Sequence, residues 1–203
     1  MNRLFGIILF LLGTRVSHAQ DLLLLMNGQE FQCKILTDEG TVFRVTAPNR
    51  FGKVKEYDLH KSDVFSVRLG DGKESVLYVQ DTILGDVYTP DEMRYYLAGQ
   101  RDARNNFKAW PTFAVGFAGC FVAAYLGGDG LITTLAPPLL YTSIQLVPKI
   151  KIREKTMSSL DYKYNDQYLD GYVPPARSRK LIRALQGGFL GAALGLGFWY
   201  LKN

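Results

Sequence analysis

Residues 109–148 constrain this chain more than any other part of its sequence, because they are almost free of charge. Their only charged residue is Asp129, which lies in a Gly-Gly-Asp-Gly sequence between two apolar arms. A helix crosses the hydrocarbon core of a bilayer with about 20 predominantly apolar residues, and each arm is close to that length. Glycines between two such segments favour a tight turn. We therefore predict that residues 109–148 form a hydrophobic helical hairpin inserted in a membrane.

The composition fits a membrane protein with one or two small domains. The chain has 203 residues, a net charge of +5 and 47% hydrophobic residues. A soluble globular core would spread its apolar residues periodically along the sequence, whereas here they are grouped in uncharged runs. The two cysteines, Cys33 and Cys120, fall in a predicted strand and in the hairpin, so we expect no disulfide between them.

The N-terminus, residues 1–19, has the three parts of a secretory signal peptide. A basic residue, Arg3, precedes a short apolar run, and small residues follow up to Ala19. We expect cleavage after Ala19, which would leave Gln20 first. An uncleaved anchor is the alternative, because Arg15 interrupts the region before the cleavage site. In both cases the residues that follow are exported.

Residues 20–85 predict a small β domain. Short segments rich in Val, Phe, Tyr and Leu alternate with turn sequences such as Asn27-Gly28. The predicted strands cover residues 22–26, 30–36, 42–46, 54–59, 64–69 and 75–79. This many short strands in about 60 residues suggests an SH3-like or Sm-like β barrel, with an open sheet as the alternative. Together with the helices that follow, the fold class is an α+β membrane protein.

A well-marked helix start predicts an amphipathic helix over residues 89–108. Thr89 can cap the helix, Pro90 suits its first position, and Glu92 completes a capping box with Thr89. The apolar residues near one stripe are Met93, Leu97, Ala103 and Phe107. We expect this helix to lie against the membrane surface before the chain enters it.

Residues 149–183 predict a basic, tyrosine-rich loop. Nine basic residues stand against four acidic ones, and four tyrosines lie between residues 162 and 172. Anionic lipid headgroups explain the basic residues; an exported protein rarely meets nucleic acid, so no nucleic-acid partner is expected. Pro174-Pro175 is expected to break the chain before a last helix.

Residues 184–201 carry no charge and predict a C-terminal transmembrane helix. Glycines recur in it every four residues, a pattern that lets membrane helices pack closely, although membrane helices are also rich in glycine generally. The expected helix-packing glycines are Gly187, Gly191 and Gly195 here and Gly116 and Gly119 on the hairpin. The partner is the hairpin arm or a second copy of the helix. Aromatic residues expected at the membrane interface are Trp110, Trp199 and Tyr200.

No catalytic, cofactor or metal site is predicted. His60 lies two residues from both Asp58 and Ser62, but residues two apart on a strand are roughly 6–7 Å apart. A nucleophile, base and orienting group must be within hydrogen-bonding distance of one another. This spacing therefore favours a solvent-facing strand edge over a catalytic triad.

Parts of the sequence resemble a family of uncharacterised cell-envelope proteins of Bacteroidota. The resemblance lies first in DLLLLMNGQEFQCKIL, residues 21–36, and in KSDVFSVRLGDGKESVLY, residues 61–78. Looser matches in the second half are Met93-Arg94-Tyr95-Tyr96, Gly99, Asp102-Ala103, Pro137-Pro138, Tyr168, Gly171-Tyr172 and Ala176-Arg177. The hairpin here is more apolar than is typical of the family. The resemblance implies a signal peptide, a small N-terminal β domain and a hydrophobic Gly/Pro-containing second half, without an activity.

These observations lead us to expect a non-enzymatic envelope protein whose exported β domain serves scaffolding or partner binding. Its partners would be the lipid bilayer and another envelope protein or a second copy. The alternative is an accessory subunit of an envelope transporter or enzyme complex.

Export of the β domain raises a question of topology. The basic residues on both sides of a spanning hairpin would lie on the exported side, against the positive-inside tendency. Either the signal overrides that tendency, the hairpin inserts without spanning, or the helices belong to another membrane or assembly.

Overall fold

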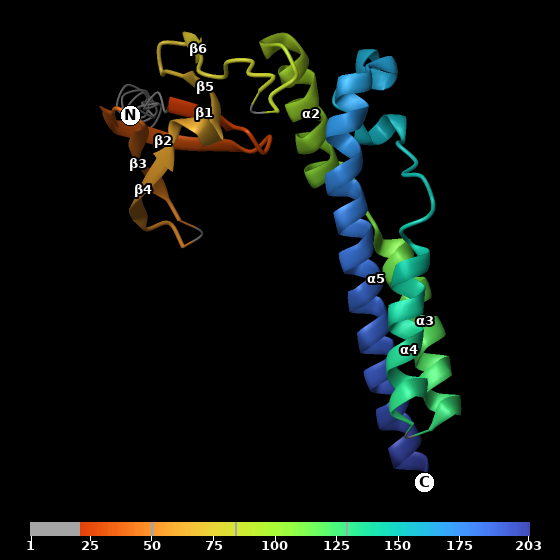
Figure 1. Cartoon of the computed structure of the whole chain (residues 1–203). Coiled ribbons are helices and arrows are strands. Elements are labelled where there is room, and N and C mark those ends of the chain that lie inside the picture. Colours follow the sequence, from red (N-terminus) through yellow and green to blue (C-terminus); the bar gives the residue numbers. More distant parts are fainter. Residues whose placement is uncertain (1–20, 50, 84, 129) are drawn as a thin grey trace, which may run out of the picture. The chain divides into compact units, whose positions relative to one another are not determined.

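The computed structural model of the chain describes residues 21–49, 51–83, 85–128 and 130–203. The predicted signal peptide lies outside these residues. The chain divides into two compact units, of which the first ends at Gln80 and the second runs from Asp81 to Asn203. The first unit is a β-sheet and the second is helical (Figure 1).

The first unit is a six-stranded antiparallel sheet. Its strands lie in the order β4-β3-β2-β1-β5-β6, and each pair is antiparallel. The strands are β1 (Asp21–Leu25), β2 (Glu30–Glu39), β3 (Val42–Pro48), β4 (Val54–His60), β5 (Val64–Arg68) and β6 (Glu74–Val76), with a 3-10 turn, η1 (Lys61–Asp63), before β5. Each segment predicted to be a strand overlaps one of these strands, with differences at the ends.

The sheet is open, so the predicted SH3-like or Sm-like barrel is wrong and the open-sheet alternative is right. Strands β4 and β6 are the outer strands of the sheet that the described residues form. Strand β6 has only three residues and pairs with β5. The sequence could not decide between the two forms, because alternating apolar residues mark one buried face in both.

The buried face of the sheet is apolar and includes the alternating residues of β3. The core cluster comprises Leu23, Cys33, Phe43, Val45, Ala47, Val64 and Val67. The Asp21 carboxylate accepts hydrogen bonds from the backbone N–H groups of Ile35 (3.2 Å) and Gly70 (3.1 Å), and so ties β1 to two other parts of the unit. Burial, with Asp21 as a second cause, raises the pKa of Cys33 to about 11, which keeps this thiol protonated.

The helical unit begins with α2 (Pro90–Asn106), and its start has the predicted capping box. The Glu92 backbone N–H donates to Thr89 Oγ1 (3.4 Å), and the Thr89 backbone N–H donates to Glu92 Oε2 (2.8 Å). Ala103 and Phe107 of the predicted stripe pack against tyrosines of α5. Because this face is covered by protein, it is not the membrane-facing surface that the sequence suggested.

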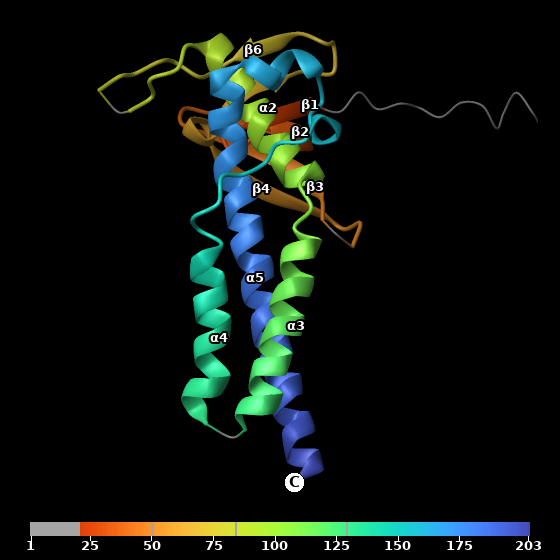
Figure 2. The same cartoon turned by 90° about the vertical axis from the view of Figure 1, so that its right-hand side faces the viewer.

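The predicted hairpin is present as two antiparallel helices, α3 (Trp110–Gly127) and α4 (Leu131–Ile144), which run side by side in Figure 2. Gly128 has a φ of 72° at the end of α3, a conformation that glycine adopts without strain. Pro137 and Pro138 lie inside α4. Proline has no N–H, so the helical hydrogen bonds that residues 137 and 138 would donate are missing. Hydroxyl groups of α4 also donate to backbone carbonyls, as Thr134 does to the Gly130 carbonyl oxygen (3.0 Å).

The last helix, α5 (Asp166–Lys202), is much longer than predicted. Its 37 residues span about 55 Å at 1.5 Å per residue. The loop predicted over residues 149–183 is therefore wrong beyond residue 165, and the C-terminal helix does not begin at 184. The irregular segment keeps only the short turns η2 (Glu154–Thr156) and η3 (Leu160–Tyr164). Pro174 and Pro175 lie inside α5 rather than before a new helix.

Candidate functional site

The two halves of α5 have different surroundings. The first half packs against α2 and the irregular segment, and the second half packs against α3 and α4 (Figures 1 and 2). The last charged residue before the apolar half of α5 is Arg183. The end of α3, the start of α4 and the C-terminus lie at the same end of the unit (Figure 2). The unit therefore has a polar part, an apolar part and a boundary between them near residue 183.

In the polar part, a buried tyrosine layer joins three segments. Tyr168 and Tyr172 are fully buried. The Tyr168 hydroxyl donates to the Asp102 carboxylate (2.7 Å), which also accepts from the backbone N–H of Ser158 (2.7 Å). The Tyr172 hydroxyl donates to Thr156 Oγ1 (2.9 Å). These two tyrosines hold the irregular segment against α2 and α5, so they belong to the interior of the unit and not to the loop that the sequence predicted there.

Burial sets the titration of these phenols. Burial is the main reason why the pKa of Tyr168 is raised, and the hydrogen bond to Asp102 is the second. Burial also raises the pKa of Tyr172, against a smaller lowering by the hydrogen bond to Thr156. Both tyrosines therefore stay neutral donors across the physiological range.

Two glycines let α2 and α5 cross closely. A Cβ at Gly99 would lie 2.2 Å from the carbonyl oxygen of Tyr168, and a Cβ at Gly171 would lie 2.0 Å from that of Tyr96. No side chain fits at such distances, so each helix rests on the backbone of the other. In the sequence, these two glycines stand out only through the family resemblance.

In the apolar part, α5 touches the backbone of α3 through three glycines. A Cβ added at Gly187, Gly191 or Gly195 would lie 2.1–2.3 Å from a carbonyl oxygen of α3. Those oxygens belong to Phe113, Phe117 and Phe121, which have the same four-residue spacing. The hairpin arm is thus the neighbour of these glycines within the chain. The four-residue spacing of the glycines follows because α5 and α3 stay in contact over two helical turns.

The two hairpin glycines differ in their surroundings. A Cβ at Gly116 would meet the Tyr141 ring at 2.6 Å and the Ala184 carbonyl oxygen at 3.3 Å, so Gly116 lies in the bundle. A Cβ at Gly119 would meet nothing within 4 Å. Gly119 therefore takes no part in the contact that the sequence analysis assigned to it.

The outside of the apolar bundle is made of exposed hydrophobic side chains. These residues are Val115, Val122, Leu126, Ile132, Leu135, Leu139, Leu140, Ile144, Phe189, Leu190, Leu194, Phe198 and Leu201. Two helices, α3 and α5, are long and apolar enough to cross a membrane, and only 17% and 33% of their apolar windows are buried. The core helix of a soluble protein would be mostly buried.

The predicted interface aromatics mark both ends of this apolar band. Trp110 begins α3 and is 65% exposed. Trp199 lies at the other end, where its indole ring is 3.3 Å from the position of a Cβ on Gly128, and Tyr200 next to it is exposed. One aromatic group therefore lies at each end of the bundle.

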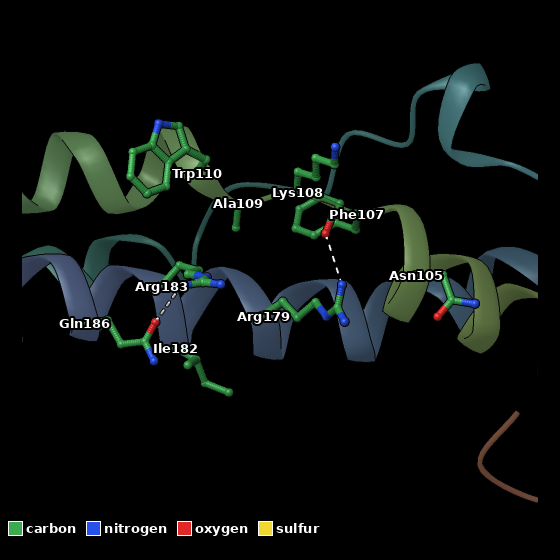
Figure 3. A pocket seen from close by; sticks show the side chains of 9 residues that line it. All are labelled: Asn105, Phe107, Lys108, Ala109, Trp110, Arg179, Ile182, Arg183 and Gln186. Atoms are coloured by element: carbon green, nitrogen blue, oxygen red, sulfur yellow. Dashed lines mark hydrogen bonds between the residues drawn. The ribbon is translucent and has the colours of Figure 1, made fainter. Parts of the chain in front are cut away.

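A basic cavity of about 460 Å³ lies at the boundary between the polar and apolar parts. Its walls come from the α2–α3 connection and from α5, and Figure 3 shows Arg179 and Arg183 extending from α5 toward that connection. The lining residues are Asn105, Phe107, Lys108, Ala109, Trp110, Arg179, Ile182, Arg183 and Gln186. Arg179 donates to the Phe107 carbonyl oxygen (3.3 Å), and Arg183 donates to Gln186 Oε1 (3.1 Å).

A second basic cavity, of about 500 Å³, adjoins the first and shares Asn105, Phe107 and Lys108 with it. Its other cations are Lys151, Arg153 and Lys155 of the irregular segment. These basic residues are evident in the sequence, but their meeting with Arg179 and Arg183 is not. The signal for that meeting is the spacing of the two arginines, which are one helical turn apart and share one face of a helix.

The three groups considered for catalysis, Asp58, His60 and Ser62, are all exposed. His60 is exposed at the end of β4, and the Asp58 carboxylate accepts a hydrogen bond from Arg44 (3.2 Å). Among the described residues, no group of three or more His, Cys, Asp or Glu side chains is placed to hold a metal ion. Comparison of the chain with protein-family models, with curated proteins and with solved structures found no match.

Proposed function

We propose that the protein is a non-enzymatic membrane protein of the bacterial cell envelope, in which α3, α4 and the second half of α5 insert into the bilayer. The β unit lies on the non-cytoplasmic side and serves scaffolding or partner binding. The observation that supports this most is the continuous band of exposed apolar side chains around the three helices. On a soluble protein such a band would be an aggregation hazard, whereas lipid would cover it.

The helix lengths agree with insertion. The 18 residues of α3 and residues 184–201 of α5 each reach about 27 Å, and the 14 residues of α4 reach about 21 Å. The hydrocarbon core is about 30 Å thick. Two full crossings and one shorter helix therefore fit, with the α3–α4 turn and the C-terminus on one side and the basic boundary on the other.

The orientation rests on the N-terminal signal. With the boundary on the exported side, its basic residues oppose the positive-inside tendency, and the signal overrides that tendency. The resemblance to Bacteroidota envelope proteins supports the same compartment. An accessory transporter subunit would be expected to carry Asp, Glu, Lys, Arg or His within its membrane helices, and residues 110–127, 131–144 and 184–201 contain none of these five residue types.

The test is fractionation of cells that express the full chain. The protein should stay in the membrane pellet after alkaline carbonate extraction, and mass spectrometry should find an N-terminus at or near Gln20. External protease added to spheroplasts should digest the β unit. Release by carbonate, or an intact Met1 together with a protected β unit, would overturn the proposal.

A further inference from the structure

We propose that the basic cavity between the α2–α3 connection and α5 binds the phosphate headgroup of an anionic phospholipid. The site goes beyond anchoring, because it makes one class of lipid a specific ligand. This inference rests on the membrane insertion proposed above, since the ligand reaches the cavity from the bilayer.

The charge of the cavity fits a phosphate group. Lys108, Arg179 and Arg183 bring three cations to it from two segments, and none of its nine lining residues carries a carboxylate. The hydrogen bonds of Arg179 to Phe107 and of Arg183 to Gln186 fix both guanidinium groups in place. A guanidinium has five N–H donors, so each arginine keeps donors for a phosphate, the partner that its planar fork suits best.

The start of α3 adds to this positive potential. Its N-cap residue is Ala109, which supplies no side-chain cap, and the first backbone N–H groups of a helix carry partial positive charge. The adjoining cavity extends the cationic surface through Lys151, Arg153 and Lys155. A headgroup in the first cavity therefore meets cations on more than one side.

The apolar part of the wall points to a lipid rather than to a soluble phosphate. Trp110 and Ile182 line the same cavity and are both exposed, and they lie where the apolar band of α3 and α5 begins. A lipid whose phosphate is held by these cations would thus have its acyl chains along this band. A soluble phosphate makes no use of such a surface, whereas an amphiphile needs both parts.

The experiment measures binding of short-chain phosphatidylglycerol to the purified full chain in neutral detergent, with short-chain phosphatidylcholine and glycerol phosphate as comparison ligands. Phosphatidylglycerol should bind at least about tenfold more tightly than either. The variant Arg179→Gln with Arg183→Gln should raise the Kd for phosphatidylglycerol about tenfold or more, because each lost contact is a charge-assisted hydrogen bond.

The matched control is Arg177→Gln with Lys180→Gln, which removes the same charge from the same helix outside the cavity; its Kd should stay within about twofold of the unchanged chain. Because Arg179 also donates a hydrogen bond within the protein, Lys108→Gln gives a second test, with a Kd raised about threefold or more.

An equal loss of binding in the control variant would show that only net charge matters, and would overturn the proposed site. Equal binding of glycerol phosphate would make the ligand a soluble phosphate, and equal binding of phosphatidylcholine would remove the role of the cations. Carbonate resistance without selective binding contradicts this inference alone, whereas release by carbonate contradicts the insertion beneath it.

Discussion

Asp102 shows how a single residue organises the polar part of the helical unit. Its carboxylate is 3% exposed, and it accepts hydrogen bonds from Tyr168 of α5 and from the backbone of Ser158. A buried carboxylate is costly unless its oxygens are hydrogen-bonded. The tyrosine and the irregular segment are therefore held in place by the same group.

Replacing Tyr168 with Phe should destabilise the helical unit by about 1–3 kcal/mol, because a buried carboxylate loses a donor. The measurement is the melting temperature of the full chain in detergent. Tyr164→Phe is the control, since Tyr164 is 85% exposed, and it should change little. Equal effects of the two substitutions would mean that the hydrogen bond to Asp102 contributes nothing to stability.

Alkaline pH should also destabilise this layer. The folded state raises the pKa of Tyr168 above the unfolded value of about 10, chiefly by burial, so it holds the phenolic proton more tightly. The resulting stability is complete below about pH 10 and is lost as the pH rises toward the folded pKa. Tyr168→Phe should make the fall in melting temperature above pH 10 shallower. An unchanged slope would contradict this assignment.

Among the elements, the contact of α5 with α3 depends on missing side chains. Three glycines of α5 rest on three carbonyl groups of α3. In a bilayer, close backbone packing must provide the attraction that the hydrophobic effect provides in water. The aromatic rings of Phe113, Phe117, Phe121 and Tyr125 also stack in a row along α3.

Gly191→Ala should lower the melting temperature of the detergent-solubilised chain, with a loss on the order of 2 kcal/mol, as for overpacked cores. The added Cβ would lie 2.1 Å from the carbonyl oxygen of Phe117, so the helices must move apart. Membrane fractionation should not change, because alanine is as compatible with lipid as glycine.

The matched control lies on the same helix. A Cβ at Gly197 meets nothing within 4 Å, so Gly197→Ala should be neutral or stabilise the chain by up to about 1 kcal/mol through helix propensity. If both substitutions raise the melting temperature equally, the α3–α5 contact does not depend on Gly191.

The elements also show what the sequence could reveal. Strand positions, the capping box at Thr89 and the hairpin follow from local signals, and the structure contains all of them. The first half of α5 does not follow, because Pro174 and Pro175 are strong local signals against a helix. Burial of Tyr168, Tyr172 and Ala176 against neighbouring segments outweighs that local cost. The basic cavity was hidden by the same error, since a predicted loop gives no reason to place Arg179 and Arg183 on one face, whereas a helix does.

For the whole molecule, the division after Gln80 predicts that the β unit folds alone. Residues 20–82 expressed by themselves should be soluble, with a β-type circular dichroism spectrum and a cooperative melt, because the core around Leu23 and Val45 lies within the sheet. A random-coil spectrum would show that the strands require the helical part.

The central claim, that lipid covers the apolar band, is tested most directly by thiol accessibility. In a chain with Cys33→Ser and Cys120→Ala, a cysteine is placed at Val122, which is 52% exposed in the chain itself. Ser178→Cys, an exposed position in the polar half of α5 outside the basic cavities, serves as the water-accessible control. In intact membranes a membrane-impermeant maleimide should label position 178 and leave position 122 unlabelled, and detergent denaturation should make both reactive. Equal labelling of the two positions in membranes would contradict insertion, because an exposed Val122 would then face water.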